Sequence, residues 1–515
     1  MIQPLLGRRI LLAVTGSIAA FKAAALASQL TQQGARVTTL LTRAAARFVT
    51  PLTFRGLTGQ PAYTDDDLWG PQGHILHVDL AHQHDLLLVY PATADTLARL
   101  AQGRAQSLVD LAALALPPGA PLVLAPAMDA GMWDHPATQA NADQLRARGA
   151  HFLGPEEGRL ASGKVARGRL VEPETALAWL RRWFARQHGP LRGSTVVVTA
   201  GPTWEALDPV RVLTNRSTGR QGFAIAQAAL DAGAEVVLIH GPVALPTPFA
   251  ARAVPVESAR QMLDAVLEHA PQADYLFKVA AVADYRPEHT AARKIKKRNE
   301  PWTLTLRPNP DILRTLAPRR AATGRPRVVV GFAAESHPDP AAVQAKLQAK
   351  GLDLLAVNDI LAPDAGFAVG TNRVRLLYAD GRSEAWPLWS KAEVARHLVA
   401  RALHVAQGFR LWLPAPRAAW EAAQATGRYL PEALARTGRL PLLRPDQPAA
   451  LAYPHLAGRA DLLRVVVDAR SLPAPPAWAP CAADLCPYLT AALPLDAVVE
   501  VAPARPDAGS PAPKA

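Results

Sequence analysis

Short runs of β-branched residues alternate with alanine-rich segments along most of this chain, and this alternation limits its fold more than any other feature. The pattern occupies residues 9–188 and returns over residues 195–404. Strands and helices in this order build βαβ units, in which helices cover both faces of a parallel sheet. The sequence therefore predicts an α/β protein with two Rossmann-like parallel-sheet domains.

Changes in composition suggest where these domains begin and end. The segment Gln187–Ser194 holds two glycines and a proline, which suits a short linker. A chain of 515 residues also has room for about three domains. We expect domains over residues 1–188 and 189–404, a small α+β domain over 409–501, and a disordered tail over 502–515.

Hydropathy and cysteine content exclude several classes of protein. No stretch of about 18 apolar residues runs without a breaker, so we expect neither a secretory signal nor any association with a membrane. The two cysteines, Cys481 and Cys486, are too few for a disulfide framework. A cytoplasmic location is therefore expected.

The net charge of +13 is mostly dispersed, with one dense cluster. Arg293, Lys294, Lys296, Lys297 and Arg298 follow one another closely, without the aromatic residues that stack on nucleic-acid bases. We expect no nucleic-acid partner. Taken alone, such a run fits a solvated loop as well as a phosphate-binding loop.

The first turn of the chain is a candidate anion site. Residues 10–14 have the pattern of a buried strand, residues 15–17 that of a tight turn, and residues 18–33 that of a helix. Backbone N–H groups at a helix N-terminus, together with the Ser17 hydroxyl, could bind a phosphate. Many such turns use Gly16 only for its conformational freedom, so the turn by itself does not settle the function.

Five motifs of the first domain share their order and spacing with a known family. They are VTGSIAAFKA (14–23), LTRAAARFVTPLTF (41–54), HVDLAHQHD (77–85), PATAD (91–95) and PAMD (126–129). Together they closely resemble the homo-oligomeric flavin-containing cysteine decarboxylases. The resemblance implies a flavodoxin-like domain with FMN held by Gly16, Ser17, Thr42, Pro91, Ala92, Thr93 and Ala94, and with substrate bound by Met128 and Asp129.

The same resemblance selects His77 from four nearby histidines as the base or carboxylate-handling group. The spacing of these histidines does not indicate a metal site. In the family, the thiol-bearing carbon is oxidised by hydride transfer to flavin, CO₂ is lost, and the resulting enethiol is reduced by the same flavin. The protein orients the substrate and moves protons.

Two positions depart from the commonest form of that family. Asp129 stands where asparagine is usual, and Ser162, within GRLASGKVARGRL (158–170), stands where a cysteine donates the last proton. A hydroxyl is far less acidic than a thiol, whose pKa is about 8.5, so we expect this proton transfer to be slower. We interpret the pair as an active variant; the alternative is a flavin domain that serves mainly as a scaffold.

The second domain begins with a strand over residues 196–199 and the stretch AGPTWEALDPVRVLTNRSTGRQG (200–222). This stretch resembles the signature of phosphopantothenate–cysteine ligases, in which Asn215 would stabilise an acyl-nucleotide intermediate. Arg220 and Gln221 replace the usual Lys-Met pair, with positive charge kept at the first position. The glycine fingerprint of a Rossmann-type NAD(P) reductase is absent from both first turns, so that alternative is disfavoured.

Further motifs of the ligase family follow in order: VAAVADYRP, KIKK, NPDIL, VGFAAES and LLAVNDI. The resemblance implies that CTP is the co-substrate and that Mg²⁺ bridges its phosphates, with metal ligands that the sequence does not identify. Within this context a phosphate-binding role for the basic cluster is favoured. The residues expected to bind nucleotide are Asp284, Lys294, Pro310, Asp311, Ile312, Leu313, Phe332, Lys346 and Lys350.

The two motif sets together resemble the bifunctional enzymes of coenzyme A biosynthesis. We therefore expect 4′-phosphopantothenate, L-cysteine and CTP as substrates, ligation first and decarboxylation to 4′-phosphopantetheine second. The family implies a homo-oligomer with trimeric flavin domains and dimeric ligase domains, up to a dodecamer. Residues 409–501 weakly resemble a small uncharacterised bacterial domain, for which a structural or interaction role is expected.

Overall fold

The computed structural model describes residues 2–70, 75–297, 299–335, 339–359, 369–406, 410–431, 434, 439–443, 453, 456, 459–468, 472, 477–481, 484–489 and 492–504. The chain divides into two compact units, one of residues 3–187 and one of residues 188–515 with the first two residues. Nowhere in the described ranges does a helix combine the length and apolarity that crossing a membrane requires.

The first unit contains a six-stranded parallel sheet in the order β3-β2-β1-β4-β5-β6. The strand order reverses between β1 and β4, which makes the carboxyl ends of these two strands the expected ligand-binding position. The strands are β1 (Arg9–Val14), β2 (Arg36–Leu41), β3 (Ala62–Thr64), β4 (Leu86–Ala92), β5 (Leu122–Pro126) and β6 (His151–Phe152).

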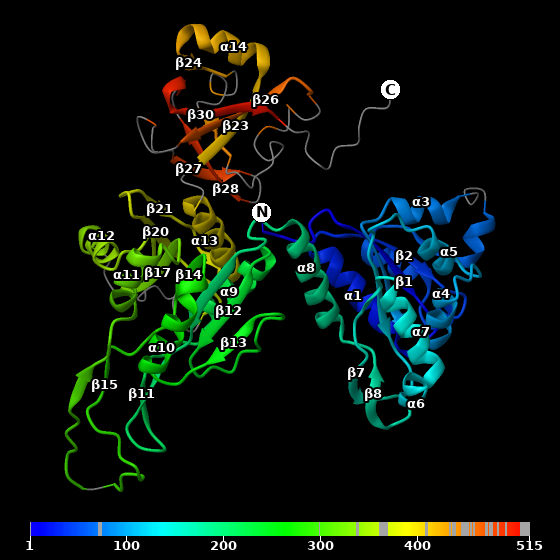
Figure 1. The fold of residues 1–515 in the computed structure, drawn as a ribbon, viewed down its shortest axis with the longest axis horizontal. Helices are drawn as coiled ribbons and strands as arrows, with labels where there is room; N and C mark the ends of the chain where they lie inside the picture. Colours follow the sequence, from blue (N-terminus) through cyan, green and yellow to red (C-terminus); the bar gives the residue numbers. More distant parts are fainter. Residues whose placement is uncertain are drawn as a thin grey trace. The chain divides into compact units, whose positions relative to one another are not determined.

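Helices cover both faces of this sheet, as Figure 1 shows. Alternate residues of β1 point to opposite faces: Ile10 and Leu12 belong to one buried cluster, whereas Leu11 belongs to the other. The helices are α1 (Phe21–Gln32), α2 (Pro51–Thr58), α3 (Leu76–His82), α4 (Ala94–Ala101), α5 (Leu108–Leu114), α6 (Ala130–Asp134), α7 (Pro136–Ala147) and α8 (Pro173–His188).

Two local features differ from a simple βαβ pattern. The helix expected over residues 18–33 begins as a 3-10 turn, η1 (Ile18–Ala20), and Ser17 caps this turn by accepting a hydrogen bond from Ala19 N at 3.2 Å. The segment that carries Ser162 forms an antiparallel hairpin of β7 (Glu156–Arg159) and β8 (Val165–Arg169). The hairpin is joined to the loop after β5 by Met128 N, which donates to Gly168 O at 3.0 Å.

The second unit contains an eight-stranded sheet in the order β13-β12-β9-β14-β17-β18-β20-β21. Its first six strands are parallel, but β20 and β21 are antiparallel, so the sheet is mixed. The strands are β9 (Thr195–Ala200), β12 (Glu235–His240), β13 (Arg252–Pro255), β14 (Tyr275–Lys278), β17 (Val328–Glu335), β18 (Leu354–Asp359), β20 (Val374–Tyr378) and β21 (Ser383–Ala385).

Five helices pack on this sheet, whose buried residues form one cluster on each face. They are α9 (Arg220–Asp231), α10 (Ala259–His269), α11 (Ile312–Thr323), α12 (Pro340–Ala349) and α13 (Lys391–Ala406). A two-stranded sheet of β19 (Thr371–Asn372) and β22 (Trp389–Ser390) precedes α13. The strand order reverses between β9 and β14, where the loops of two predicted ligase motifs meet.

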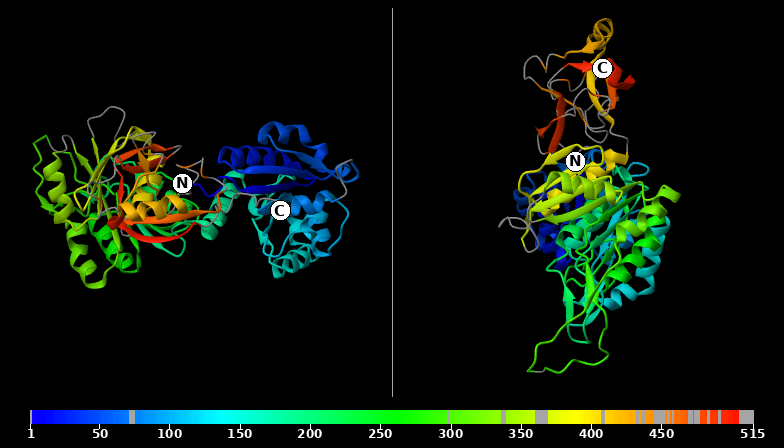
Figure 2. Two further views of the ribbon diagram at one scale, coloured as in Figure 1. Left: turned by 90° about the horizontal axis from the view of Figure 1, so that it is seen from above. Right: turned by 90° about the vertical axis from the view of Figure 1, so that its left-hand side faces the viewer.

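Two short hairpins extend from the strand ends of the second unit and are called the arm below. They are the pair β10 (Trp204–Ala206) and β11 (Val212–Thr214) and the pair β15 (Tyr285–Pro287) and β16 (Leu306–Pro308). The right-hand view of Figure 2 shows the arm projecting well beyond the strands of the unit's main sheet. The basic cluster lies in the long connection between β15 and β16.

Within its described residues, the C-terminal part combines one α-helix, α14 (Arg417–Thr426), with three small antiparallel sheets. These are β23-β26-β30, β25-β28-β27 and β24-β29. Strand β30 pairs with β26 through residue 503, so the tail predicted from residue 502 overlaps this strand by two residues. The bounds are β23 (Arg410–Pro416), β24 (Arg428–Tyr429), β25 (Leu440–Pro441), β26 (Leu462–Asp468), β27 (Ala477–Cys481), β28 (Asp484–Leu489), β29 (Leu493–Pro494) and β30 (Val498–Pro503).

Candidate active sites

A cavity of about 470 Å³ opens at the carboxyl ends of β1, β2, β4 and β5. This is the point at which the strand order of the first unit reverses. Sequence positions far apart meet there because parallel strands deliver their carboxyl ends to one edge of the sheet. Six of the residues predicted to bind flavin or substrate line the cavity: Gly16, Ser17, Thr42, Thr93, Ala94 and Met128.

The cavity wall suits an anionic group. A Cβ on Gly16 would lie 2.4 Å from Ala44 Cβ, so only glycine lets the first turn approach the residues after β2. Thr93 caps α4 by accepting from Thr96 N at 3.3 Å, which leaves the first N–H groups of that helix at the cavity. These features fit a phosphate-bearing cofactor.

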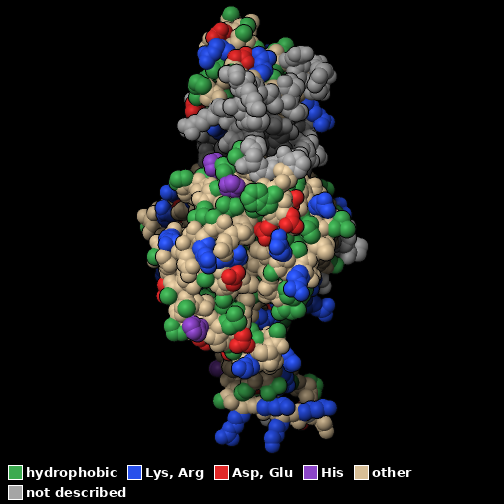
Figure 3. Space-filling model, turned by 90° about the vertical axis from the view of Figure 1, so that its right-hand side faces the viewer, with side chains coloured by type: hydrophobic (Ala, Val, Ile, Leu, Met, Phe, Trp, Pro, Cys, Tyr) green, Lys and Arg blue, Asp and Glu red, His purple; other side chains and the backbone are tan. Residues whose placement is uncertain are grey.

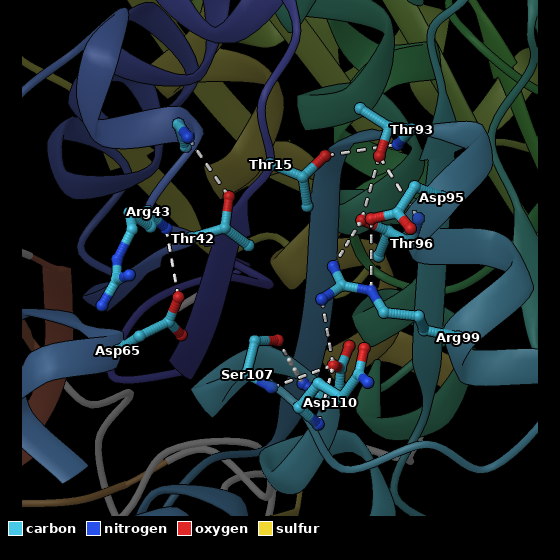
Figure 4. Close-up of polar contacts among 12 residues, drawn as sticks. Thr15, Thr42, Arg43, Asp65, Thr93, Asp95, Thr96, Arg99, Ser107 and Asp110 are labelled. Carbon is cyan, nitrogen blue, oxygen red and sulfur yellow. Dashed lines mark hydrogen bonds and ion pairs between the residues drawn. The ribbon is translucent and has the colours of Figure 1, made fainter.

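Pro91 and Ala92 are not among the cavity-lining residues, because they form the last part of β4. The end of β4 is joined to the site through Thr15, whose hydroxyl accepts from Thr93 N at 3.2 Å (Figure 4). The same hydroxyl donates to Pro91 O at 2.7 Å. Buried Thr15 thus fixes the position of Thr93 relative to the end of β4.

A charged network that the sequence did not reveal lies beside the cavity (Figure 4). The Arg99 guanidinium lies 3.3 Å from Asp95 Oδ2 and 3.3 Å from Asp110 Oδ2. Burial raises the pKa of Asp110, although Arg99 and the Ser107 hydrogen bonds act in the opposite direction. Only the i,i+4 spacing of Asp95 and Arg99 could have signalled this network from the sequence.

The two departures from the decarboxylase family, Asp129 and Ser162, contact each other. Ser162 Oγ donates to Asp129 Oδ2 at 2.8 Å, and Asp129 Oδ1 accepts from Gly131 N at 3.1 Å as the N-cap of α6. The Ser162 hydrogen bond lowers the pKa of Asp129. The hairpin that carries Ser162 is therefore joined to the predicted substrate-binding motif by a side chain as well as by its backbone.

The structure does not bring His77 into the cavity of its own chain. His77 lies on α3 and is absent from the residues that line the cavity. Its Nδ1 atom is buried and has no hydrogen-bond partner in the described part of the chain. The role predicted for His77 therefore stays a prediction.

In the second unit, four of the nine predicted nucleotide-binding residues, Asp284, Asp311, Lys346 and Lys350, belong to one charged cluster. Lys350 Nζ lies 2.9 Å from Asp311 Oδ2, and Lys346 Nζ lies 2.8 Å from Glu335 Oε1. Asp311 also caps α11 by accepting from the backbone N–H groups of residues 313 and 314, which fixes its carboxylate. Ile312 and Leu313 are buried in the first turn of α11, directly after Pro310.

Lys278, which the sequence did not single out, interacts electrostatically with the charged residues of this cluster. Burial lowers its pKa to about 8, and the positive charges of Lys350 and Lys346 act in the same direction. Asp311 and Asp284 partly offset them. A half-buried lysine at the end of a parallel strand in α/β proteins is well placed to bind an anion.

Asn215 is bound to the loop that follows β14. Its Nδ2 donates to Ala281 O at 3.0 Å and to Val282 O at 3.3 Å. The same loop is held by Asn309 Nδ2, which donates to Ala283 O at 2.8 Å. Two predicted motifs therefore meet at this loop, and half-buried Phe332 packs on the core from the neighbouring strand β17.

Lys294 lies apart from this cluster, in the exposed connection of the arm. Within the described residues, no hydrogen bond or ion pair joins Lys294 to Asp284, Lys346 or Lys350. Figure 3 shows lysine and arginine side chains gathered at the end of the arm. The structure therefore brings together the predicted residues Asp284, Asp311, Lys346 and Lys350, but not Lys294.

Comparison with family models divides the chain in three. The model described as "Flavoprotein" matches residues 3–184, and that described as "DNA/pantothenate metabolism flavoprotein C-terminal domain" matches residues 191–405. A third model, "Protein of unknown function (DUF952)", matches residues 414–501.

Curated relatives match over most of their own length. The coenzyme A biosynthesis bifunctional protein CoaBC of Bacillus subtilis is 43% identical over 390 residues, which cover 75% of this chain and 95% of the relative. The CoaBC protein of Mycobacterium tuberculosis (strain H37Rv) is 43% identical over 404 residues, with 76% and 95% covered.

Among solved structures, the C-terminal domain of a CoaBC protein is 35% identical with a TM-score of 0.37, covering 43% of this chain and 99% of that one. The FMN-binding protein AtHal3 is 30% identical with a TM-score of 0.33, covering 35% and 98%.

Proposed function

Because the chain belongs to the family of coenzyme A biosynthesis bifunctional proteins, we propose that its two units catalyse consecutive steps from 4′-phosphopantothenate to 4′-phosphopantetheine. It is an enzyme with a phosphopantothenate–cysteine ligase half and a flavoprotein phosphopantothenoylcysteine decarboxylase half. Our proposal concerns which cofactors and which nucleotide the enzyme uses, and which residues carry out each step. The main support for this proposal is a hydrogen bond from Asn215 to the loop after β14. This loop follows Lys278, which interacts electrostatically with Asp311 and Lys350.

For the ligase, we propose that CTP activates the acid. The carboxylate of 4′-phosphopantothenate attacks the α-phosphate of CTP, which gives an acyl cytidylate and pyrophosphate; the amine of cysteine then displaces CMP. Activation replaces a poor leaving group by a good one. Asn215 holds the acyl cytidylate, and Asp284, residues 310–313 and Phe332 position the nucleotide.

The cations of the second unit neutralise charge on the triphosphate and on the departing pyrophosphate. Lys346 and Lys350 do so from one end of α12, and Lys294 from the arm. When nucleotide binds, Lys346 and Lys350 would release the carboxylates of Glu335 and Asp311 and bind phosphate oxygens instead. Mg²⁺ needs only one or two carboxylates in addition to phosphates, which is compatible with the carboxylates of this cluster.

For the decarboxylase, we propose FMN as the cofactor, held by Gly16, Ser17, Thr42, Thr93 and Ala94 at the cavity. Pro91 and Ala92 act by fixing Thr93 through Thr15. FMN supplies the hydride chemistry when bound. The chain contributes Met128 and Asp129 for substrate binding and Ser162 for delivery of the last proton.

His77 is proposed to handle the substrate carboxylate. Since it does not line the cavity of its own chain, we assign it to the cavity of a neighbouring copy in a trimer of flavin domains. The ligase units would pair as dimers, so that the assembly reaches a dodecamer. Sedimentation of the intact chain tests this state.

The proposed function is tested by incubating the full chain with 4′-phosphopantothenate, cysteine and CTP. Pyrophosphate, CO₂ and 4′-phosphopantetheine are measured separately, and all three are expected. ATP in place of CTP should give much less pyrophosphate. Pyrophosphate without CO₂, from a chain with a flavin spectrum, would favour a flavin domain that is only a scaffold. Exchange of hydride with NADPH would favour the reductase alternative.

A further inference from the structure

The basic cluster of the arm is attached to the rest of the arm through the residue in its middle. Ile295 stands between Lys294 and Lys296, and both of its backbone polar groups are bonded. Ile295 N donates to Asp208 Oδ2 at 3.0 Å, and Ile295 O accepts from Arg211 Nη2 at 3.2 Å. A peptide segment held at both its N–H and its C=O has a defined position and direction.

Asp208 and Arg211 are themselves held firmly. Asp208 Oδ1 accepts from Val210 N and from Arg211 N, each at 2.9 Å, which folds residues 208–211 into a tight turn. Asp208 Oδ2 accepts from Arg211 Nε at 3.1 Å and from Arg211 Nη2 at 2.6 Å. The Asp208 side chain is 0% exposed, and the Arg211 hydrogen bonds lower its pKa. A carboxylate with donors on both oxygens is a rigid attachment point.

The same turn contacts the connection on either side of the basic cluster. Thr290 Oγ1 donates to Ala206 O at 2.9 Å, and Ala291 N donates to Leu207 O at 3.0 Å. Beyond the cluster, the Arg211 guanidinium lies 5.2 Å from the centre of the Trp302 ring. The connection is therefore held before, within and after its lysines.

Without this attachment, repulsion among the lysines would favour opening of the loop at Ile295. Lys294, Lys296 and Lys297 are exposed, and within the described residues none of them has an acidic partner. Like charges at this spacing repel one another. The bonds from Asp208 and Arg211 to Ile295 are thus the contacts that oppose opening of the loop at its most charged point.

We propose that the Asp208–Arg211 ion pair is a positioning device for the lysine loop: it keeps the loop folded as one segment at the end of the arm, and this folded segment is the part that meets the phosphates of the nucleotide. The inference rests on the proposed function, in which Lys294 binds CTP. Asp208 and Arg211 do not touch the nucleotide; they are positioning residues that act through Ile295.

The test compares the full-length Asp208→Asn and Arg211→Lys variants with the parent chain in the pyrophosphate assay. Asp208→Asn removes the charge that orients Arg211, and Arg211→Lys replaces the branched donor by a single ammonium group. We expect KM for CTP to rise about tenfold in Asp208→Asn and less in Arg211→Lys. KM for cysteine should stay within about twofold, because cysteine reacts after the phosphates have left.

A second readout reports on the loop itself. Brief treatment of the intact chain with trypsin, followed by mass spectrometry, gives the rate of cleavage after residues 294, 296 and 297. These cuts should become several-fold faster in both variants, since neither substitution removes a cleavage site in the loop. Asp143→Asn, which breaks an exposed Asp–Arg pair of the same i,i+3 spacing on α7, is the matched control and should change neither readout.

The outcomes separate the inference from the proposed function. An Asp208→Asn variant with unchanged KM for CTP overturns the inference, and so does a lower kcat with unchanged KM, which indicates partial unfolding only. If Asp208→Asn does not fold, Arg211→Lys decides by the same criteria. Lys294→Ala tests the function: normal use of CTP by this variant refutes the nucleotide role of the loop, whatever Asp208 does.

Discussion

At the scale of single residues, the contact between Ser162 and Asp129 bears most directly on decarboxylation. A hydroxyl that donates to an ionised carboxylate is a weak acid, and the Ser162 hydrogen bond keeps Asp129 ionised by lowering its pKa. If Ser162 delivers the last proton, that transfer is expected to be the slow step.

The first prediction concerns this step. Ser162→Ala should release CO₂ but accumulate the enethiol, whereas Ser162→Cys should speed formation of 4′-phosphopantetheine by about tenfold or more, because a thiol is the stronger acid. Chromatography of the products after a fixed number of turnovers gives the ratio of enethiol to phosphopantetheine. Ser28→Ala, at a half-buried position of α1 outside the cavity, is the control. An unchanged ratio in Ser162→Ala would exclude Ser162 as the donor.

The second prediction uses the pKa of about 8 that burial gives Lys278. Above pH 8 the free protein holds this amine mostly neutral, whereas triphosphate oxygens beside it favour the charged form. CTP binding at pH 8.5 should therefore take up a proton, and at pH 6.5, where the amine is charged in both states, it should not. Calorimetry of CTP binding in two buffers of different ionisation enthalpy measures this uptake. Lys278→Met should abolish it; uptake that persists would assign the proton to another group.

Residues of the two sites differ in how well the sequence indicated them. Gly16, Ser17, Thr42 and Asp311 occur in motifs next to strand ends, and the topology alone brings such positions together. Lys278 and Arg99 were missed because their importance comes from burial and from distant charges, which no local pattern reports. The KIKK motif predicts that Lys294 binds nucleotide together with the other residues, but Lys294 lies in the arm, apart from the charged cluster.

At the scale of elements, the hairpin β7–β8 depends on one glycine. Gly168 has φ of 147°, and a Cβ at this position would lie 2.3 Å from Met128 O. Any side chain there must separate the hairpin from the loop that carries Met128 and Asp129.

The third prediction is that Gly168→Ala destabilises the first unit by about 1–3 kcal/mol and lowers CO₂ release, with pyrophosphate release unchanged. Gly163→Ala is a matched control in the same hairpin: φ is 85°, yet no atom lies within 4 Å of the added Cβ. It should show only the smaller cost of backbone strain. Thermal unfolding and the two product assays measure the difference; equal effects of both substitutions would contradict the steric argument.

Long elements were predicted well from the sequence, and short ones were not. Strands such as β9 are continuous apolar runs, and α9 follows a recognisable turn. The hairpins of the arm have strands of three residues, which depend on partners far along the chain, and the antiparallel edge β20–β21 carries no local sign of its direction.

At the scale of the whole molecule, the two units have separate cores. Buried clusters of the first unit contain no residue beyond Phe184, and those of the second contain, apart from Ile2, only residues from Leu191 onward. Units with separate cores can unfold as separate cooperative transitions. A ligand that binds one folded unit stabilises that unit by mass action, by about 2.7 kcal/mol at a concentration one hundred times its Kd.

The fourth prediction follows from this separation and from the proposed cofactors. In differential scanning calorimetry of the full chain, added FMN should raise the melting temperature of one transition, and added CTP with Mg²⁺ should raise that of another. Substitutions assign the transitions: Gly168→Ala should lower only the FMN-sensitive transition, because its clash lies wholly within residues 3–187. Gly241→Ala, whose Cβ would lie 1.6 Å from Pro202 O, should lower only the CTP-sensitive transition. If either ligand moved both transitions equally, the units would be energetically coupled, and the ligase and decarboxylase halves could not be treated as independent folding units.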